Sequence, residues 1–190
     1  PILAIITSPR VAWVVSVAGV GSAFLAAILL QSITESIGRV TYHLGNWEPP
    51  WGIEFVVDSA TSLTLVIMTG LAFLATLYAR ASLLAEIKHI DLGKCYAAWL
   101  LASGGLFGLV ATGDAFNLFV FLEISALSSA ILISMGARTD RQALSAGFNY
   151  LLIGAVGATF YVIGVGFVYA ITGTLNTVSY THLTLPTKVY

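Results

Sequence analysis

The chain has 190 residues, of which 58% are hydrophobic and 9% are charged, and its formal net charge is -1. Soluble domains carry about 25% charged residues, so this chain has too few charges to cover a water-facing surface. This low charge content excludes an ordinary soluble enzyme and a disordered segment. A nucleic-acid binder is excluded too, because the chain has no excess of basic residues to bind phosphates. The mean hydropathy of +0.93 indicates a helical integral membrane protein, since barrel strands alternate apolar and polar residues.

The first half of the sequence predicts a helix end, two spans and a loop between them. Residues 1–6 (PILAII) are apolar but too short for a bilayer, which takes about 20 residues. We interpret them as the tail of a helix whose start is missing. Residues 11–30 carry no charge and predict the first full span. In the loop at residues 34–58, strand-like pieces flank a Gly/Asn/Pro/Pro turn region, which predicts a small hairpin. The second span covers residues 59–79, and we expect it to begin a turn earlier, near Phe55.

Three further spans are predicted at residues 95–113, 115–137 and 142–173. The last is long enough to cross with tilt or a kink. The prediction is therefore an all-α, polytopic transmembrane helix bundle of about six helical segments without a soluble domain. In lipid, the Gly104-xxx-Gly108 spacing predicts close helix packing. The single cysteine, Cys95, can form neither an intrachain disulfide nor a zinc site.

The basic residues gather on one side of these spans. When the loops alternate across the membrane, Arg39 and Lys188 fall on one face and all others on the opposite face: Arg10, Arg80, Lys88, Lys94, Arg138 and Arg141. Cytoplasmic loops carry the excess of Lys and Arg. The loops near residues 10, 80–94 and 138–141 are therefore predicted to be cytoplasmic, and the loop at residues 32–54 to lie on the opposite face.

Glu123 is the most informative residue. It lies nine residues after Asp114, so roughly 13 Å along a helix and near the middle of a bilayer core of about 30 Å. An acid at that depth costs about 2.5–3.5 kcal/mol on insertion scales and marks an ion pathway by default. We expect it to face the bundle interior and to exchange a proton, while a structural carboxylate locked to one polar partner is the alternative.

The other acidic and polar residues near the spans have ordinary structural explanations. Asp114 and Asp58 precede predicted helices, where an N-cap role accounts for both. Asn149 lies deep enough to require a hydrogen-bond partner, which predicts an interhelical bond. No nucleotide loop, haem ligation pattern or nucleophile–base arrangement is present in the sequence. We therefore expect no cofactor, no metal site and no covalent chemistry in the chain.

Three stretches carry a family resemblance: ATGDAFNLFVFLE (111–123), LGNWEPPWGIEFVVD (44–58) and the shorter ITGTLN (171–176). They resemble, in order, the TGD-x-FNLFVFFE helix of antiporter-like membrane proteins, the GGW-x-PPFGI segment before their third helix, and the GTLN after their sixth. The chain is most similar to the family of D subunits of Mrp-type monovalent cation (sodium)/proton antiporters. The same superfamily includes the proton-pumping membrane subunits of NADH:quinone oxidoreductase (complex I) and of membrane-bound hydrogenases.

The resemblance implies a roughly fourteen-helix subunit built from inverted repeats, of which this chain is the N-terminal part. The acid of the family's fifth helix matches Glu123, and the family lysine that works with it lies on a seventh helix beyond this chain. Residues 1–176 are then the N-terminal transmembrane helices. Residues 177–190 (TVSYTHLTLPTKVY) resemble appended vector or adaptor sequence, and we expect a non-native tail there.

The leading functional hypothesis is a proton-translocating membrane subunit of a multisubunit Na⁺/H⁺ antiporter, with Glu123 as its proton station. The expected partners are the lipid bilayer, other subunits of the complex, protons and Na⁺, and the expected location is the bacterial inner (plasma) membrane. One alternative is a proton-pumping subunit of an NADH:quinone oxidoreductase or membrane-bound hydrogenase, although the GNWEPPWGIE stretch favours the antiporter. A second alternative is a scaffold subunit that does not conduct.

Overall fold

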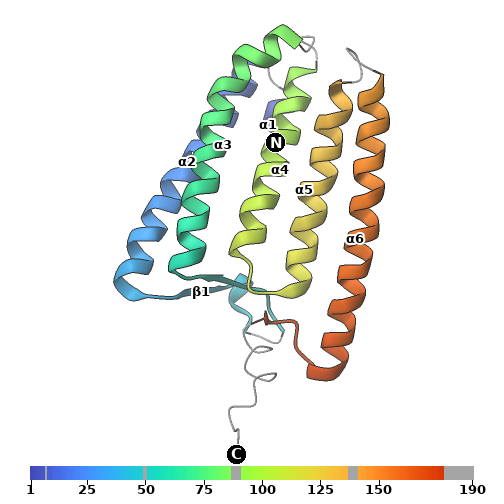
Figure 1. Cartoon of the computed structure of the whole chain (residues 1–190). Helices are drawn as coiled ribbons and strands as arrows, with labels where there is room; N and C mark the ends of the chain where they lie inside the picture. The colour runs from blue at the N-terminus through green and yellow to red at the C-terminus, as the bar shows by residue number, and fades with distance from the viewer. Residues whose placement is uncertain (7, 49–50, 87–90, 137–140, 178–190) are drawn as a thin grey trace, which may run out of the picture.

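The structure, a computed structural model, describes residues 1–6, 8–48, 51–86, 91–136 and 141–177. Figure 1 shows long helices side by side, with a short strand pair across one end of the bundle. Five of the described helices are long and apolar enough to cross a membrane, which confirms the predicted helical bundle. The described elements are α1 (Ile2–Ile6), α2 (Pro9–Ile37), β1 (Val40–His43), the 3-10 turn η1 (Leu44–Asn46), β2 (Glu54–Val57), α3 (Ser59–Glu86), α4 (Leu92–Ala111), α5 (Ala115–Met135) and α6 (Gln142–Thr172).

The up-and-down course of the chain gives the bundle two unlike ends (Figure 1). The hairpin end carries β1, β2, the α4–α5 turn and the segment after α6. The basic end carries the start of α2, the end of α3, the start of α4 and the start of α6. The described members of the predicted basic side all lie on elements of the basic end: Arg10, Arg80, Lys94 and Arg141. Lys88 and Arg138 lie outside the described residues.

The predicted hairpin is present, and its strands correct the start of the next helix. β1 pairs antiparallel with β2 in a register that sets Val40 against Val57 and His43 against Glu54. Because residues 54–57 are extended in this ladder, α3 begins at Ser59 and not near Phe55. It then continues to Glu86, past the predicted end at residue 79, so Arg80 lies within a helix. Gly38, with φ 87°, makes the left-handed turn from α2 into β1.

Small residues bring α4 and α5 into close contact, as predicted, at Gly108 of the predicted pair but not at Gly104. A Cβ on Gly105 would lie 2.9 Å from the Ser125 nitrogen, and a Cβ on Gly108 would collide with the Phe121 ring. A Cβ on Gly104 would have open space. The close face is therefore Gly105 and Gly108, three residues apart, which is also a helical neighbour spacing.

The sixth helix packs mainly against one of the other described helices. α6 packs along α5 and makes no comparable contact with the other described helices. Most of its surface is exposed, including the side chain of Asn149. The interhelical hydrogen bond expected for Asn149 is thus not formed within the described part of the chain, because this residue lies on the side of α6 away from α5.

Candidate functional site

Glu123 lies near the middle of α5 and is half-buried. Successive residues of a helix are rotated by 100°, so Ala130 and Ser134 lie within about 20° of the direction of Glu123. Both residues pack against Gly147 of α6. Glu123 therefore lies on the α6 side of α5, whereas Phe121 and Ser125 face α4. Within the described residues no hydrogen bond or ion pair of its carboxylate is found.

Small residues of α6 come level with Glu123. α5 and α6 run antiparallel (Figure 1), and Gly154 of α6 lies 4.0 Å, measured from an added Cβ, from Ala126. Because the helices are antiparallel, going from Ala126 back to Glu123 on α5 corresponds to going from Gly154 forward to Gly157 on α6. The neighbouring Ala158 is buried, while a Cβ on Gly157 would meet no atom within 4 Å. Small residues of α6 therefore lie level with Glu123 along the bundle.

A second polar group lies at the hairpin end and was not identified from the sequence. We call it the hairpin-end cluster. Its members are at least nine-tenths buried and come from β2, the α4–α5 turn, the first turn of α5 and the segment after α6: Glu54, Asp114, Asn117, Thr174 and Asn176. Buried polar groups in folded proteins have hydrogen-bond partners, so each side chain of this cluster is expected to have one.

Glu54 joins three segments that are far apart in the sequence. Its carboxylate accepts a 2.5 Å hydrogen bond from the Asn176 amide and lies 3.5 Å from Nε2 of His43. Its carbonyl oxygen accepts a hydrogen bond from the Gly113 N–H at 2.8 Å. The Ala115 N–H in turn donates to the Leu175 carbonyl oxygen at 2.9 Å. The strand pair, the α4–α5 turn and the segment after α6 are thereby tied into one junction.

Asp114 has the N-cap role that the sequence predicts. Its carboxylate accepts a hydrogen bond from the Asn117 N–H at 2.7 Å, while the Asn117 side chain donates to the Thr112 hydroxyl at 3.0 Å. Burial raises the pKa of Asp114 above its usual value, and the backbone N–H groups of Asn117 and Phe116 oppose that change. Asp58 caps α3 in the same way, by accepting from the Thr61 N–H at 2.8 Å. Both N-cap predictions are confirmed.

The three stretches that carry the family resemblance meet in this junction. Glu54 belongs to the stretch at residues 44–58, Asp114 to the stretch at 111–123 and Asn176 to the stretch at 171–176. The sequence shows these three motifs separately, but their meeting in one junction is visible only in the structure. Glu123 is separate from the junction, because nine helical residues, roughly 13 Å of rise, lie between it and Asp114. The structure does not bring these two acids together.

An apolar cavity of about 390 Å³ lies between α5, α6 and the segment after α6. The Tyr161 hydroxyl at its wall donates to the Ala115 carbonyl oxygen at 3.0 Å. In the described part of the chain no cluster of three or more His, Cys, Asp or Glu side chains could hold a metal ion.

Comparison with known proteins gives a consistent family. Residues 112–187 match the family model described as NADH:quinone oxidoreductase/Mrp antiporter, TM. The chain is 44% identical over 135 residues, 71% of its length, to the N subunit of the NADH-quinone oxidoreductase of Desulforudis audaxviator, and covers 26% of that protein. It is 34% identical over 152 residues, 80% of its length, to the D subunit of the Na⁺/H⁺ antiporter of Bacillus subtilis, and covers 30% of it. The chain thus spans about a quarter to a third of these relatives.

Solved structures give the same result for the fold. A chain of the membrane-bound sulfane sulfur reductase, an archaeal respiratory membrane complex, superposes with a TM-score of 0.85 at 29% identity. That match covers 97% of this chain and 37% of the other. A chain of the Mrp complex from Dietzia superposes with a TM-score of 0.76 at 27% identity and covers 89% of this chain and 31% of the other.

Proposed function

We propose that this chain, whose helices belong to the transmembrane family of NADH:quinone oxidoreductase and Mrp antiporter proteins, forms part of a proton-translocating subunit with Glu123 as its protonatable station. The single observation that carries the proposal is the position of Glu123. An acid near the middle of a span costs about 2.5–3.5 kcal/mol on insertion scales, so a residue retained there is a functional candidate.

The surroundings of Glu123 support a proton-exchanging role over a structural one. A carboxylate that stabilises the fold is held by a donor, as Glu54 is held by Asn176. Glu123 has no such partner among the described residues, and the α6 residues level with it are small. A cationic side chain or water supplied by another part of the complex would be such a partner. Such a partner would favour the charged form while the membrane interior favours the neutral one, which allows the proton to be taken up and released.

We further propose that protons and Na⁺ are the exchanged ions, within a multisubunit complex of the bacterial plasma membrane. The Bacillus subtilis relative, named as part of a Na⁺/H⁺ antiporter, supports this choice. The segment at residues 177–190 remains a proposed non-native tail, and positions 178–190 lie outside the described residues.

The test is sodium-dependent proton exchange in everted membrane vesicles with the full-length gene in its operon. Glu123→Gln keeps the side-chain size and removes the titratable proton, so exchange is expected to be lost while the complex still assembles on a native gel. Glu123→Asp retains the charge one methylene short and should keep part of the activity. Glu35→Gln, at an exposed position near the end of α2, is the matched control. Wild-type exchange in the Glu123→Gln complex would refute the proposal, and lost assembly would instead favour the scaffold hypothesis.

The alternative is a proton-pumping subunit of a redox-driven complex. The specific observation in its favour is the higher identity to the N subunit of an NADH-quinone oxidoreductase, 44% against 34% for the antiporter protein. Under this alternative Glu123 keeps its role, but wild-type vesicles acidify on addition of NADH and show no sodium-linked exchange. Genes for iron–sulfur or flavin proteins beside this gene would agree with that result, whereas genes for small antiporter proteins would agree with the first proposal.

A further inference from the structure

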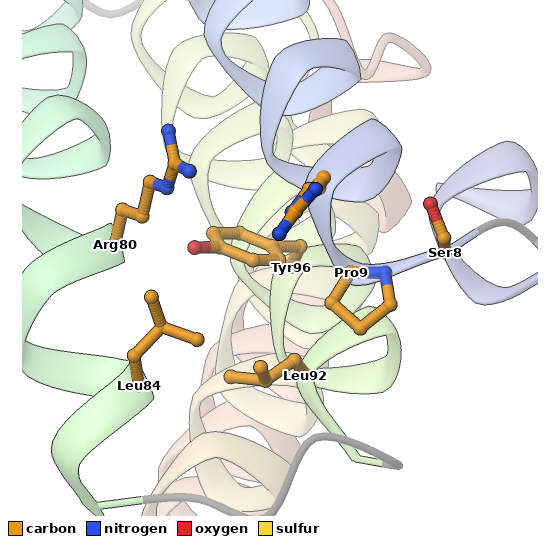
Figure 2. A pocket seen from close by; sticks show the side chains of 7 residues that line it. Ser8, Pro9, Arg80, Leu84, Leu92 and Tyr96 are labelled. Atoms are coloured by element: carbon orange, nitrogen blue, oxygen red, sulfur yellow. The ribbon is translucent and has the colours of Figure 1, made fainter.

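A cavity of about 500 Å³ opens at the basic end of the bundle, where the first turns of α2 and α4 approach α3. Figure 2 shows side chains from all three elements around it: Ser8 and Pro9 at the start of α2, Arg80 and Leu84 from α3, and Leu92 and Tyr96 from α4. Arg10 completes the lining. Two guanidinium groups therefore line one cavity beside three apolar side chains.

The charge in this cavity is positive and is not balanced by its lining. None of the lining residues is acidic. The described acid nearest in sequence, Asp91, lies 3.4 Å from the ammonium group of Lys94. Within the described part of the chain no carboxylate pairs with Arg10 or Arg80. Two guanidinium groups that line one cavity favour an anion in it, and their planar sets of donors suit phosphate oxygens.

Arg80 is held in place by an aromatic ring. Its guanidinium carbon lies 4.7 Å from the centre of the Trp13 ring. The Trp13 indole is fixed because its N–H donates to the Thr76 carbonyl oxygen at 3.1 Å. Tyr96 is 2% exposed, and its hydroxyl points toward α3 (Figure 2). The cavity thus has a preorganised cation and a hydroxyl donor at its wall.

The start of α2 adds further donors. Ser8 is the N-cap of this 29-residue helix, yet its hydroxyl makes no capping hydrogen bond. The first turn of α2 holds no acidic residue, so nothing within the helix offsets the partial positive charge of its N-terminus. A phosphate oxygen at this position would meet the positive end of the helix together with the two arginines.

We propose that this cavity binds the phosphate group of an anionic phospholipid, with its acyl chains along the apolar side chains. The cavity lies at the membrane end that carries the excess of basic residues, which indicates the cytoplasmic leaflet, where anionic lipids are concentrated. Leu84 and Leu92 beside the arginines match a ligand that is charged at one end and apolar at the other. A free phosphate compound would use the same donors but not the apolar wall.

The experiment measures phospholipid retained by the full-length protein in its assembled complex. Wild type and variants are reconstituted in nanodiscs of phosphatidylcholine containing a small fraction of phosphatidylglycerol, then extracted in detergent, and bound lipid is quantified by mass spectrometry. The Arg10→Gln/Arg80→Gln double variant should retain phosphatidylglycerol about thirtyfold more weakly, from the contribution of each arginine near a membrane surface. Arg141→Gln, at the same end but outside the cavity, is the matched control and should retain it like wild type.

Further measurements distinguish a bound phospholipid from a free phosphate compound and control for a folding defect. The Arg10→Lys/Arg80→Lys variant keeps both charges and should restore most retention. Phosphatidylcholine retention should be the same in all variants, and inorganic phosphate should not displace the lipid. Equal phosphatidylglycerol retention in wild type and the Arg→Gln double variant overturns the proposal. Displacement by inorganic phosphate without any preference between the two lipids also overturns it, in favour of a free phosphate compound.

Discussion

The two adjacent glycines of α4 give a sharp test of the packing. A Cβ at position 105 would lie 2.9 Å from the Ser125 nitrogen and 3.0 Å from the Phe121 carbonyl oxygen. Both are backbone atoms of α5 and cannot rotate away. A Cβ at position 104 would meet nothing within 4 Å. Gly104→Ala and Gly105→Ala therefore add the same methyl group to the same helix, one into open space and one into a neighbouring backbone.

The expected difference in stability between the two variants follows from two opposing effects. Replacing Gly by Ala in a helix gains about 1 kcal/mol of intrinsic propensity, and this gain is common to both variants. Overpacking a close contact costs about 1–3 kcal/mol, and only Gly105→Ala incurs it. The difference between the two free energies of unfolding thus isolates the clash, and Gly105→Ala should be less stable than Gly104→Ala by about 1–3 kcal/mol.

The assay is unfolding of the full-length protein in mixed micelles with increasing SDS, followed by circular dichroism. Proton exchange is measured in parallel, because Phe121 and Ser125 flank Glu123 on α5 and any displacement of this helix also moves the proposed proton station. We expect Gly105→Ala to reduce exchange and Gly104→Ala to leave it intact. Equal stability and equal exchange in the two variants would show that α4 and α5 are not in this close contact.

Further predictions concern the caps and the hairpin-end cluster. Asp114→Ala should destabilise the fold by about 0.5–2 kcal/mol through loss of the N-cap. Asp114→Asn keeps a capping oxygen and removes a charge that burial disfavours. The unfolding midpoint of Asp114→Asn at neutral pH should therefore equal or exceed that of wild type. Asn176→Ala removes a donor to the buried carboxylate of Glu54 and should cost about 1–3 kcal/mol, seen as a lower thermal midpoint and faster proteolysis of the hairpin; an unchanged midpoint would count against the junction. The Thr61 N–H lowers the pKa of Asp58 below its usual value of 3.8. The ionised cap therefore stabilises the fold at pH values above 3.8, and this stabilisation is lost as the pH falls through the lowered pKa. When the unfolding midpoint is measured against pH in the acid range, it should fall less steeply in Asp58→Asn than in wild type.

The spans and their caps could be predicted because they depend on local properties of the sequence. The uncharged length determines where a helix can cross the membrane, and Asp58 and Asp114 are recognised as caps from the few residues that follow each. The same local reasoning misplaced the start of α3 near Phe55. That apolar segment satisfies a helix pattern, but its backbone hydrogen bonds go to β1 across the hairpin, a partner more than ten residues away.

The hairpin-end cluster could not be predicted from local patterns, because its partners are distant in the sequence. Glu54 in a loop gives no indication of burial until Asn176, 122 residues later, is placed beside it. Gly104 was predicted in place of Gly105 for a related reason. A glycine pair indicates that a helix can approach a neighbour, but the face that does so is fixed by the neighbour. Asn149 needs a partner that the described helices do not provide, which agrees with relatives much longer than this chain.

The long separation between Glu54 and Asn176 has a consequence for biosynthesis. Chains are synthesised at about 5–20 residues per second, so Asn176 follows Glu54 by about 6–24 s for a separation of 122 residues. During that interval, His43, which is already present in the adjacent strand, is the partner available to the Glu54 carboxylate. The hairpin can therefore form early with a provisional contact between these two side chains. Its final anchoring to the α4–α5 turn and to the segment after α6 waits until the sixth helix has been translated and inserted. A ribosome stalled before residue 176 would leave the junction open and its buried acid accessible to water.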